Sequence, residues 1–506
     1  MARHRKLFWL VSFAALIALS PLFDNITQAG RCGNSAPPAA PQRRKGGESF
    51  PPLPLPATPL RRTEKKKPPA PPSLVGKVEY GKIVWATNEQ GQRYSYRDWT
   101  TDPTDIINLL NWSDSQLGIR YKPTNVGLDS FSYNPAEIPI LYFTGHEKLE
   151  FTDEYRAKLY RYVMDGGYIL GSACCGAKPF TEGFVKEMAQ TFPDRPLKVL
   201  AADHPLFQCF YQVGDVQYRD GNKLTEKRAP YLLGMNVGCR TAVIMSPFDL
   251  CCGWDGHPDP GGEGLVRKDA MEVGANMITY CLANYQLGRF LATEKVYFQQ
   301  GEATRDEMIF GQVVHEGDWD PCPSAVANLL KFAAGNSTLS VQFKKEAVDL
   351  RKADALTHPL LYMTGHDDFK LSEAEVVGLR NYLKAGGLLF ADSCCGRASF
   401  AAAFKREMQK VLPDKSFEAL DPNHPIFRSR AMITQVSYTP MMKQQMPGFQ
   451  QPYLEGITIN GALAVVFSPY GMGTSWDGEV RPYSLAYTPE DAMRLGTNIL
   501  IYSMTH

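Results

Sequence analysis

Short apolar runs alternate along the chain with segments in which apolar residues recur at helical spacing. The segment after the first run places Leu159, Tyr162 and Val163 on one helix face, and Thr152 is a suitable N-terminal cap for that helix. Alternation of this kind predicts an α/β fold with a mainly parallel sheet and helices on both faces. Buried strands are predicted at 138–143, 168–173, 241–245, 388–393 and 462–467.

The second half of the chain repeats the first. Leu141–His146 returns as Leu361–His366, 220 residues later. A repeat of this length predicts two tandem domains, which we place at 74–290 and 300–506. Four motifs match at this offset: Asp98-Trp99 with Asp318-Trp319, Gly166-Gly167 with Gly386-Gly387, Cys174-Cys175-Gly176 with Cys394-Cys395-Gly396, and His204-Pro205 with His424-Pro425. Two more match at an offset of 222: Ser246-Pro247 with Ser468-Pro469, and Trp254-Asp255 with Trp476-Asp477.

The N-terminal segment is typical of export. Residues 1–29 combine a basic start with an apolar run, and they fit a signal peptide or an N-terminal membrane anchor. Residues 30–73 are rich in proline and basic residues, which favours a disordered, extended linker over a packed domain. We therefore expect an exported protein of the periplasm or cell envelope, attached to the inner membrane if the first segment is retained.

The charge balance excludes one class of partner. The formal net charge is +1, and no basic groove with stacking aromatic residues is apparent, so we expect no nucleic-acid binding. The expected partner is instead an unknown small ligand or an envelope protein.

Several matched polar residues follow predicted strands. Ligands of parallel α/β sheets bind beyond the carboxyl ends of the strands, so these residues are candidate binding residues. Ser172 in the first copy is replaced by Asp392 in the second, so the two pockets are expected to differ. The candidates for binding are Cys175, Cys395, Ser172, Asp392, Ser246, Ser468, Trp254, Asp255, Trp476 and Asp477.

The cysteine turns have two interpretations. A thiol on a tight turn between a strand and a helix is typical of a nucleophile, with Cys174 or Cys394 at the tip and a histidine as base. Small side chains that fill a crowded turn, or oxidised thiols, are the structural alternative. A bridge to Cys251-Cys252 would suit the first copy, whereas the second has Gly473 and Thr474 there. The candidate bases are His146, His366, His204 and His424.

A metal site is the weaker hypothesis. His146, His204 and Asp255 have ligand chemistry, and Cys251, Cys252, Asp255 and His257 lie close together in the first copy. No close ligand spacing accompanies them. We therefore expect no metal and no cofactor.

These motifs together resemble a bacterial family catalogued as domain of unknown function 4159. The resemblance covers residues 80–290 and 305–506. That family is similar in fold to class I glutamine amidotransferases and trehalose-utilisation domains, which implies two flavodoxin-like three-layer domains. The His-x-Glu pair that amidotransferases carry late in the domain is replaced here by Trp254-Asp255 and Trp476-Asp477.

Two functions remain as hypotheses. The first is a tethered binding or scaffold module of the cell envelope, favoured by duplication without a complete catalytic set. The alternative is a thiol-dependent hydrolase or amidotransferase-like enzyme that uses a cysteine and a histidine.

Overall fold

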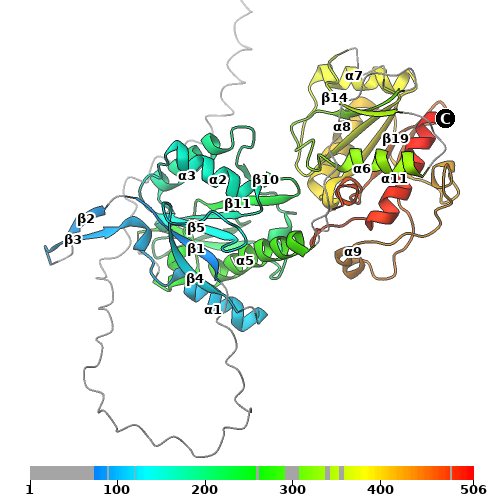
Figure 1. Cartoon of the computed structure of the whole chain (residues 1–506). Helices are drawn as coiled ribbons and strands as arrows, with labels where there is room; N and C mark the ends of the chain where they lie inside the picture. The colour runs from blue at the N-terminus through cyan, green and yellow to red at the C-terminus, as the bar shows by residue number, and fades with distance from the viewer. Residues whose placement is uncertain are drawn as a thin grey trace, which may run out of the picture.

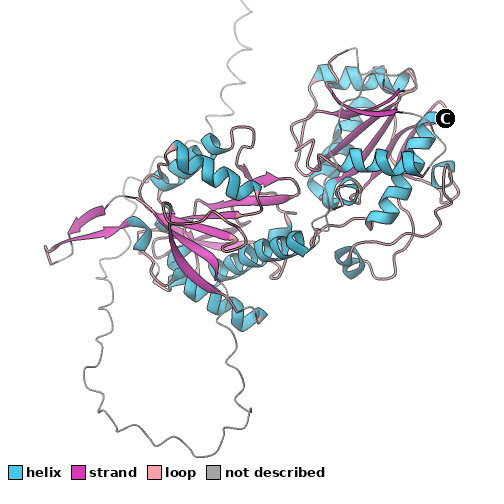
Figure 2. Ribbon diagram, viewed as in Figure 1, coloured by secondary structure: helices cyan, strands magenta, loops and turns pink. Residues whose placement is uncertain are grey.

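The chain contains two similar α/β units, each built around a seven-stranded sheet (Figures 1 and 2). The structure is a computed structural model, and the predicted segments 1–29 and 30–73 lie outside its described residues except for Ser73, which begins β1. The described residues are 73–81, 83–87, 90–118, 120–257, 261–290, 307–336, 342–352, 358–478 and 481–506.

The first copy begins with β1 and ends with the long helix α5. Its strands are β1 (Ser73–Glu79), β2 (Ile83–Thr87), β3 (Arg93–Arg97), β4 (Lys122–Gly127), β5 (Ile140–Gly145), β6 (Tyr168–Ala173), β7 (Lys198–Val199), β8 (Val216–Asp220), β9 (Lys223–Arg228), β10 (Leu233–Val237), β11 (Arg240–Ser246) and β12 (Glu263–Leu265). Its helices are η2 (Asp98–Thr100), α1 (Asp105–Leu117), α2 (Asp153–Met164), η3 (Cys174–Gly176), α3 (Lys178–Thr191), η4 (Pro205–Phe207), α4 (Cys251–Asp255) and α5 (Arg267–Phe290).

Over its described residues, the second copy follows the same order with fewer strands. Its strands are β13 (Glu307–Val313), β14 (Gln342–Val348), β15 (Leu360–Gly365), β16 (Leu388–Ser393), β17 (Glu418–Ala419), β18 (Glu455–Ile459) and β19 (Ala462–Ser468). Its helices are α6 (Ala325–Gly335), α7 (Glu373–Lys384), η6 (Cys394–Gly396), α8 (Ala398–Val411), η7 (Pro425–Phe427), α9 (Pro440–Gln445), α10 (Gly473–Trp476) and α11 (Pro489–Thr505).

The two large sheets have the same topology. Their strand orders are β4-β1-β5-β6-β11-β10-β7 and β14-β13-β15-β16-β19-β18-β17. The first five strands of each order pair in parallel, and the last two pair antiparallel. The predicted fold class, two tandem α/β domains with mainly parallel sheets, is therefore confirmed.

Helices cover both faces of each sheet. In the first copy α1, α4 and α5 pack together, whereas α2 and α3 form a separate pair. The side chains of β5 alternate between the two cores, with Tyr142 in one and Leu141 and Phe143 in the other. Strands β5 and β6 are consequently buried along their whole length, which explains their continuous apolar sequences.

Matched helices of the two copies begin with side-chain caps, and the cap predicted at Thr152 is present. The Thr152 hydroxyl accepts the Tyr155 N–H at the start of α2, and Ser372 with Glu375 forms a capping box at the start of α7. Each cap starts its helix directly after the loop that follows a central strand. The same loop carries a matched histidine, so the caps help to fix where that histidine lies.

Two features of the first copy were not anticipated. The hairpin of β2 and β3 extends away from the unit (Figure 1), and β12, β8 and β9 form a separate three-stranded sheet. Among the described residues, no helix combines the length and the apolar character needed to span a membrane.

Candidate functional site: two Cys-His-Asp sets and two thiol clusters

Each cysteine turn joins a central strand to a helix in a strained conformation. Strand β6 ends at Ala173, and Cys175 then has a positive φ of 55°. Cys395 has the same φ of 55° after β16. A left-handed non-glycine residue is costly and is often retained for function. The left-handed thiol is thus Cys175 or Cys395, one position beyond Cys174 and Cys394, where the sequence placed the tip.

A histidine and an aspartate lie beside the first turn. The His146 N–H, directly after β5, donates to both carboxylate oxygens of Asp98, at 3.0 and 2.8 Å. The His146 Nδ1 is 3.1 Å from Asp98 Oδ1. A ring nitrogen of His146 also lies within 4.8 Å of the sulfurs of Cys174 and Cys175. The three side chains therefore form a Cys175–His146–Asp98 set.

The second copy repeats this set. The His366 Nδ1 lies 2.7 Å from Asp318 Oδ2, and a ring nitrogen is within 4.8 Å of Cys395 Sγ. The sequence reasoning found both histidines and all four thiols of the turns but did not assign the aspartates. The signal was present, because Asp98-Trp99 and Asp318-Trp319 match at the offset that relates the histidines.

The electrostatics of the set favour a charged imidazole. Burial would lower the pKa of His146, but hydrogen bonding to Asp98 and Cys175 raises it to about 10. The pKa of His366 is raised well above its ordinary value by Asp318, Cys239 and Cys395, against the opposing effect of burial. An imidazolium beside a thiol stabilises the thiolate.

The other two candidate histidines have structural hydrogen bonds. The His204 Nδ1 accepts the Leu206 N–H at 3.1 Å, and its Nε2 lies 2.8 Å from Thr241 Oγ1. The His424 ring likewise accepts the Ile426 N–H at 3.2 Å. These rings cap η4 and η7 and do not belong to the two Cys-His-Asp sets. His204 also lines a small cavity that includes His366.

Most of the candidate binding residues make hydrogen bonds to other parts of the same domain. The Trp254 and Trp476 indoles are buried and donate to helix carbonyls at 2.8 and 2.9 Å. The remaining side chains close loops through these contacts: Ser172 with Leu250 N, Ser246 with Phe248 O, Ser468 with Tyr470 O, Asp392 with Met472 N and Gly473 N, Asp255 with Thr104 N, and Asp477 with Ser324 Oγ.

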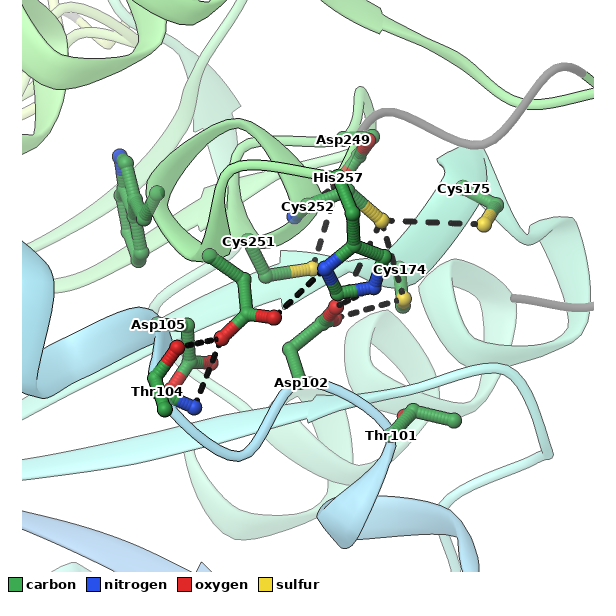
Figure 3. A network of polar contacts seen from close by, with 12 residues as sticks. Thr101, Asp102, Thr104, Asp105, Cys174, Cys175, Asp249, Cys251, Cys252 and His257 are labelled. Atoms are coloured by element: carbon green, nitrogen blue, oxygen red, sulfur yellow. Dashed lines mark hydrogen bonds and ion pairs between the residues drawn. The ribbon is translucent and has the colours of Figure 1, made fainter. Parts of the chain in front are cut away.

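Four thiols of the first copy form a buried group, the first thiol cluster, of Cys174, Cys175, Cys251 and Cys252 (Figure 3). The Cys252 sulfur is 3.6 Å from Cys174 Sγ and 3.9 Å from Cys175 Sγ. Cys174 Sγ also donates to Asp102 Oδ2 at 2.9 Å. The turn and α4 are thus adjacent, as a bridge would require, but all ten cysteines of the described residues are free thiols.

The second thiol cluster contains Cys239, Cys322, Cys394 and Cys395. Cys239 Sγ lies 3.1 Å from Cys322 Sγ and 3.6 Å from Cys394 Sγ. Cys322 occupies the position of Asp102 in the repeat, whereas Cys239 comes from the β10–β11 turn of the first copy. Gly473 and Thr474 do stand where the first copy has Cys251 and Cys252. The thiols beside Cys394 are instead Cys322 of the same domain and Cys239 of the first copy.

Several contacts join the copies around this cluster. Asp203 accepts hydrogen bonds from the Arg397 guanidinium at 3.1 and 3.2 Å and from the Ser399 N–H at 3.0 Å. The rings of Tyr280 and Tyr483 stack with centroids 5.9 Å apart. The second cluster thus belongs to a packed interface between the domains.

Both clusters contain groups spaced closely enough to hold a metal ion. In the first copy these are Asp102, Cys174, Cys251 and Cys252, and Asp102 also lies 3.3 Å from His257 Nε2. Sequence reasoning placed Cys251, Cys252 and His257 near one another but missed Asp102, which has no motif around it. In the second copy the groups are Cys239, His366, Cys394 and Cys395.

The comparisons with known proteins identify a family but no activity. The model of the family described as "Domain of unknown function (DUF4159)" matches residues 90–282 and 309–504. No curated protein matches the chain. One solved structure, described as a "putative phosphosugar isomerase" from Silicibacter pomeroyi DSS-3, is 10% identical over 63% of this chain and 75% of that one. Its TM-score of 0.16 gives it no weight. The chain therefore belongs to the DUF4159 family and carries two copies of its domain.

Proposed function

We propose that the protein is a thiol-dependent hydrolase or amidotransferase-like enzyme whose active site is the Cys175–His146–Asp98 set of the first copy. The observation that supports this is the recurrence of the same three residue types, from the same three loops, in both copies. A nucleophile, a base and a group that orients the base are the parts that acyl transfer by a thiol requires.

The proposed reaction is acyl transfer from an amide or ester. The Cys175 thiolate attacks the carbonyl carbon, and a sulfur–carbon bond forms. The His146 imidazolium gives its proton to the leaving amine or alcohol as the bond to that group breaks. Water, deprotonated by His146, then hydrolyses the thioester and restores the thiol. Asp98 is a positioning residue, since its carboxylate holds both the ring and the backbone N–H of His146.

A second candidate is a ligand- or partner-binding module of the cell envelope, exported and held by the N-terminal segment. The burial of the thiols favours this candidate, because Cys175 is 2% exposed and Cys174 is fully buried. A buried thiol that never meets a substrate serves packing or binding rather than catalysis.

Alkylation of the native chain distinguishes the two candidates. We expect iodoacetamide to label Cys175 faster than Cys281, a fully buried cysteine whose pKa burial raises well above its ordinary value. His146→Gln should slow the labelling of Cys175 by about 10-fold or more, because the thiolate loses its imidazolium partner. Peptide mapping by mass spectrometry at timed intervals gives both rates.

An acyl-enzyme test completes this experiment. Treatment with p-nitrophenyl acetate should place an acetyl group on Cys175, and Cys175→Ser should remove that signal. Equal labelling of Cys175 and Cys281, or a disulfide from Cys175 to Cys251 or Cys252 in protein from the native envelope, would exclude the enzyme and leave the binding module. The urea midpoint of His146→Gln controls for loss of fold.

A further inference from the structure

We propose that Cys239, Cys394, Cys395 and His366 bind one Zn²⁺ ion, which ties the first copy to the second. This inference goes beyond the proposed function, which uses the first copy alone. Three sulfurs and one imidazole nitrogen form a Cys3His set, one of the usual ligand sets of structural zinc. All four ligand atoms lie within 4.8 Å of one another.

The sulfur spacing fits a metal better than a disulfide. A tetrahedral site with zinc–sulfur bonds of about 2.3 Å places two sulfurs about 3.8 Å apart. The sulfurs of Cys239 and Cys394 are 3.6 Å apart. A disulfide would instead require a separation of about 2.05 Å. Only small movements would bring these two sulfurs to zinc-binding positions.

The hydrogen bonding of His366 is typical of a metal-bound histidine. His366 Nδ1 is engaged by Asp318 at 2.7 Å, which leaves Nε2 for another partner. That Nε2 is buried and has no hydrogen-bond partner of ordinary geometry among the described residues, and its side chain is 4% exposed. A buried ring nitrogen without a partner is unfavourable, and a carboxylate on the opposite nitrogen is the usual support of a metal-bound histidine.

The ligands come from both domains. Cys394 and Cys395 form the η6 turn, and His366 follows β15. Cys239 is 155 residues before Cys394 and belongs to the first copy. The turn that carries Cys239 also contains Gly238, which has a φ of 61° and where an added Cβ would contact the Pro321 carbonyl of the second copy. An ion bound here would cross-link the two sheets.

The charge of the site is also compatible with zinc. Zinc binding would displace the second ring proton of His366, because a histidine ligand must be neutral. Three thiolates, a neutral imidazole and Zn²⁺ then carry one net negative charge together. The Arg481 guanidinium, which lines the same cavity as Cys239, His366 and Cys395, offsets that charge. Soft thiolates with an imidazole select zinc over magnesium or calcium, which prefer oxygen ligands.

The proposal is tested by metal analysis of the full chain, prepared with reductant and Zn²⁺ and then freed of loose metal by gel filtration. Cys239→Ser and His366→Gln should each contain one zinc equivalent less than the wild type. Cys209→Ser is the matched control and should keep the wild-type value, because Cys209 lies outside both clusters. Any metal on the first thiol cluster adds equally to the wild type and to the variants, so the difference in zinc content between them reports the proposed site alone.

Co²⁺ gives a second readout. The Co²⁺-loaded wild type should show the thiolate charge-transfer and tetrahedral ligand-field bands, and Cys239→Ser should lose part of both. Equal metal content in the wild type and in both variants would overturn the proposal, as would a Cys239–Cys322 disulfide in native protein. Cys175→Ser should keep this zinc equivalent, so a failure of the proposed catalysis is seen separately. A urea midpoint for each variant shows whether it has folded.

Discussion

Replacing Lys77 with methionine should destabilise the first copy by about 3–5 kcal/mol, because it leaves a buried carboxylate without its counter-ion. The Lys77 ammonium is 2.8 Å from Asp105 Oδ1 and also donates to the Asp102 carbonyl. The two side chains are 6% and 1% exposed. This pair joins β1 to α1 next to the first thiol cluster. Urea unfolding followed by a probe in the first copy measures the loss.

The second copy supplies the control for this experiment. Its register places Gln312 at the position of Lys77, because each residue pairs with the equivalent tyrosine of the neighbouring strand. Ala325 stands at the position of Asp105. The double variant Lys77→Gln/Asp105→Ala should therefore recover most of the lost stability. A double variant as unstable as Lys77→Met would show that the cost does not come from the unpaired charge.

The destabilisation should depend on pH. Burial, opposed by Lys77, raises the pKa of Asp105 from 3.8 to about 6. A carboxyl whose folded pKa is raised favours the fold below its unfolded pKa, and that contribution is lost as pH rises through the folded pKa. Without Lys77 the pKa of Asp105 rises further. The stability difference between Lys77→Met and the wild type should thus be larger at pH 8 than at pH 5, and a constant difference would contradict this account.

Gly145→Ala should lower the reactivity of the proposed nucleophile, Cys175, although it leaves Cys175 itself unchanged. A Cβ at position 145 would collide with the carboxylate of Asp98 and the hydroxyl of Tyr80. The displaced carboxylate would release His146, whose ring and N–H it holds. We expect alkylation of Cys175 to slow by about 10-fold or more and stability to fall by about 1–3 kcal/mol. Timed alkylation with peptide mapping reports the rate.

Gly365→Ala is the matched control in the second copy. Its Cβ would meet the Gly317 carbonyl instead of the Asp318 carboxylate. A comparable loss of stability is expected, while the alkylation rate of Cys175 stays at the wild-type value. If Gly145→Ala leaves that rate unchanged, Asp98 has no positioning role.

The sequence alone determined the architecture of the repeat. Apolar runs and helical spacing predicted the central strands and the helices on both faces, and the repeat placed equivalent histidines and cysteines at equivalent strand ends. These signals are local, because periodicity reflects which side of one element is buried. The small sheet of β8, β9 and β12 was missed, since its strand β9 is exposed along its whole length and has no apolar pattern.

The tertiary structure decided which side chains meet. Asp98 contacts His146, which lies 48 residues later in the chain, and the match of Asp98 with Asp318 marks the residue in the sequence without showing what it contacts. Cys239 has no counterpart in the second copy, so the repeat does not mark it as a candidate site residue. In the folded chain it nevertheless contacts Cys394 of the other domain. Such contacts depend on the order of the strands and on the packing of the domains. The hydrophobic pattern of a single segment contains no information about either. The sequence therefore determined two similar domains, and the packing between them made their two sites different.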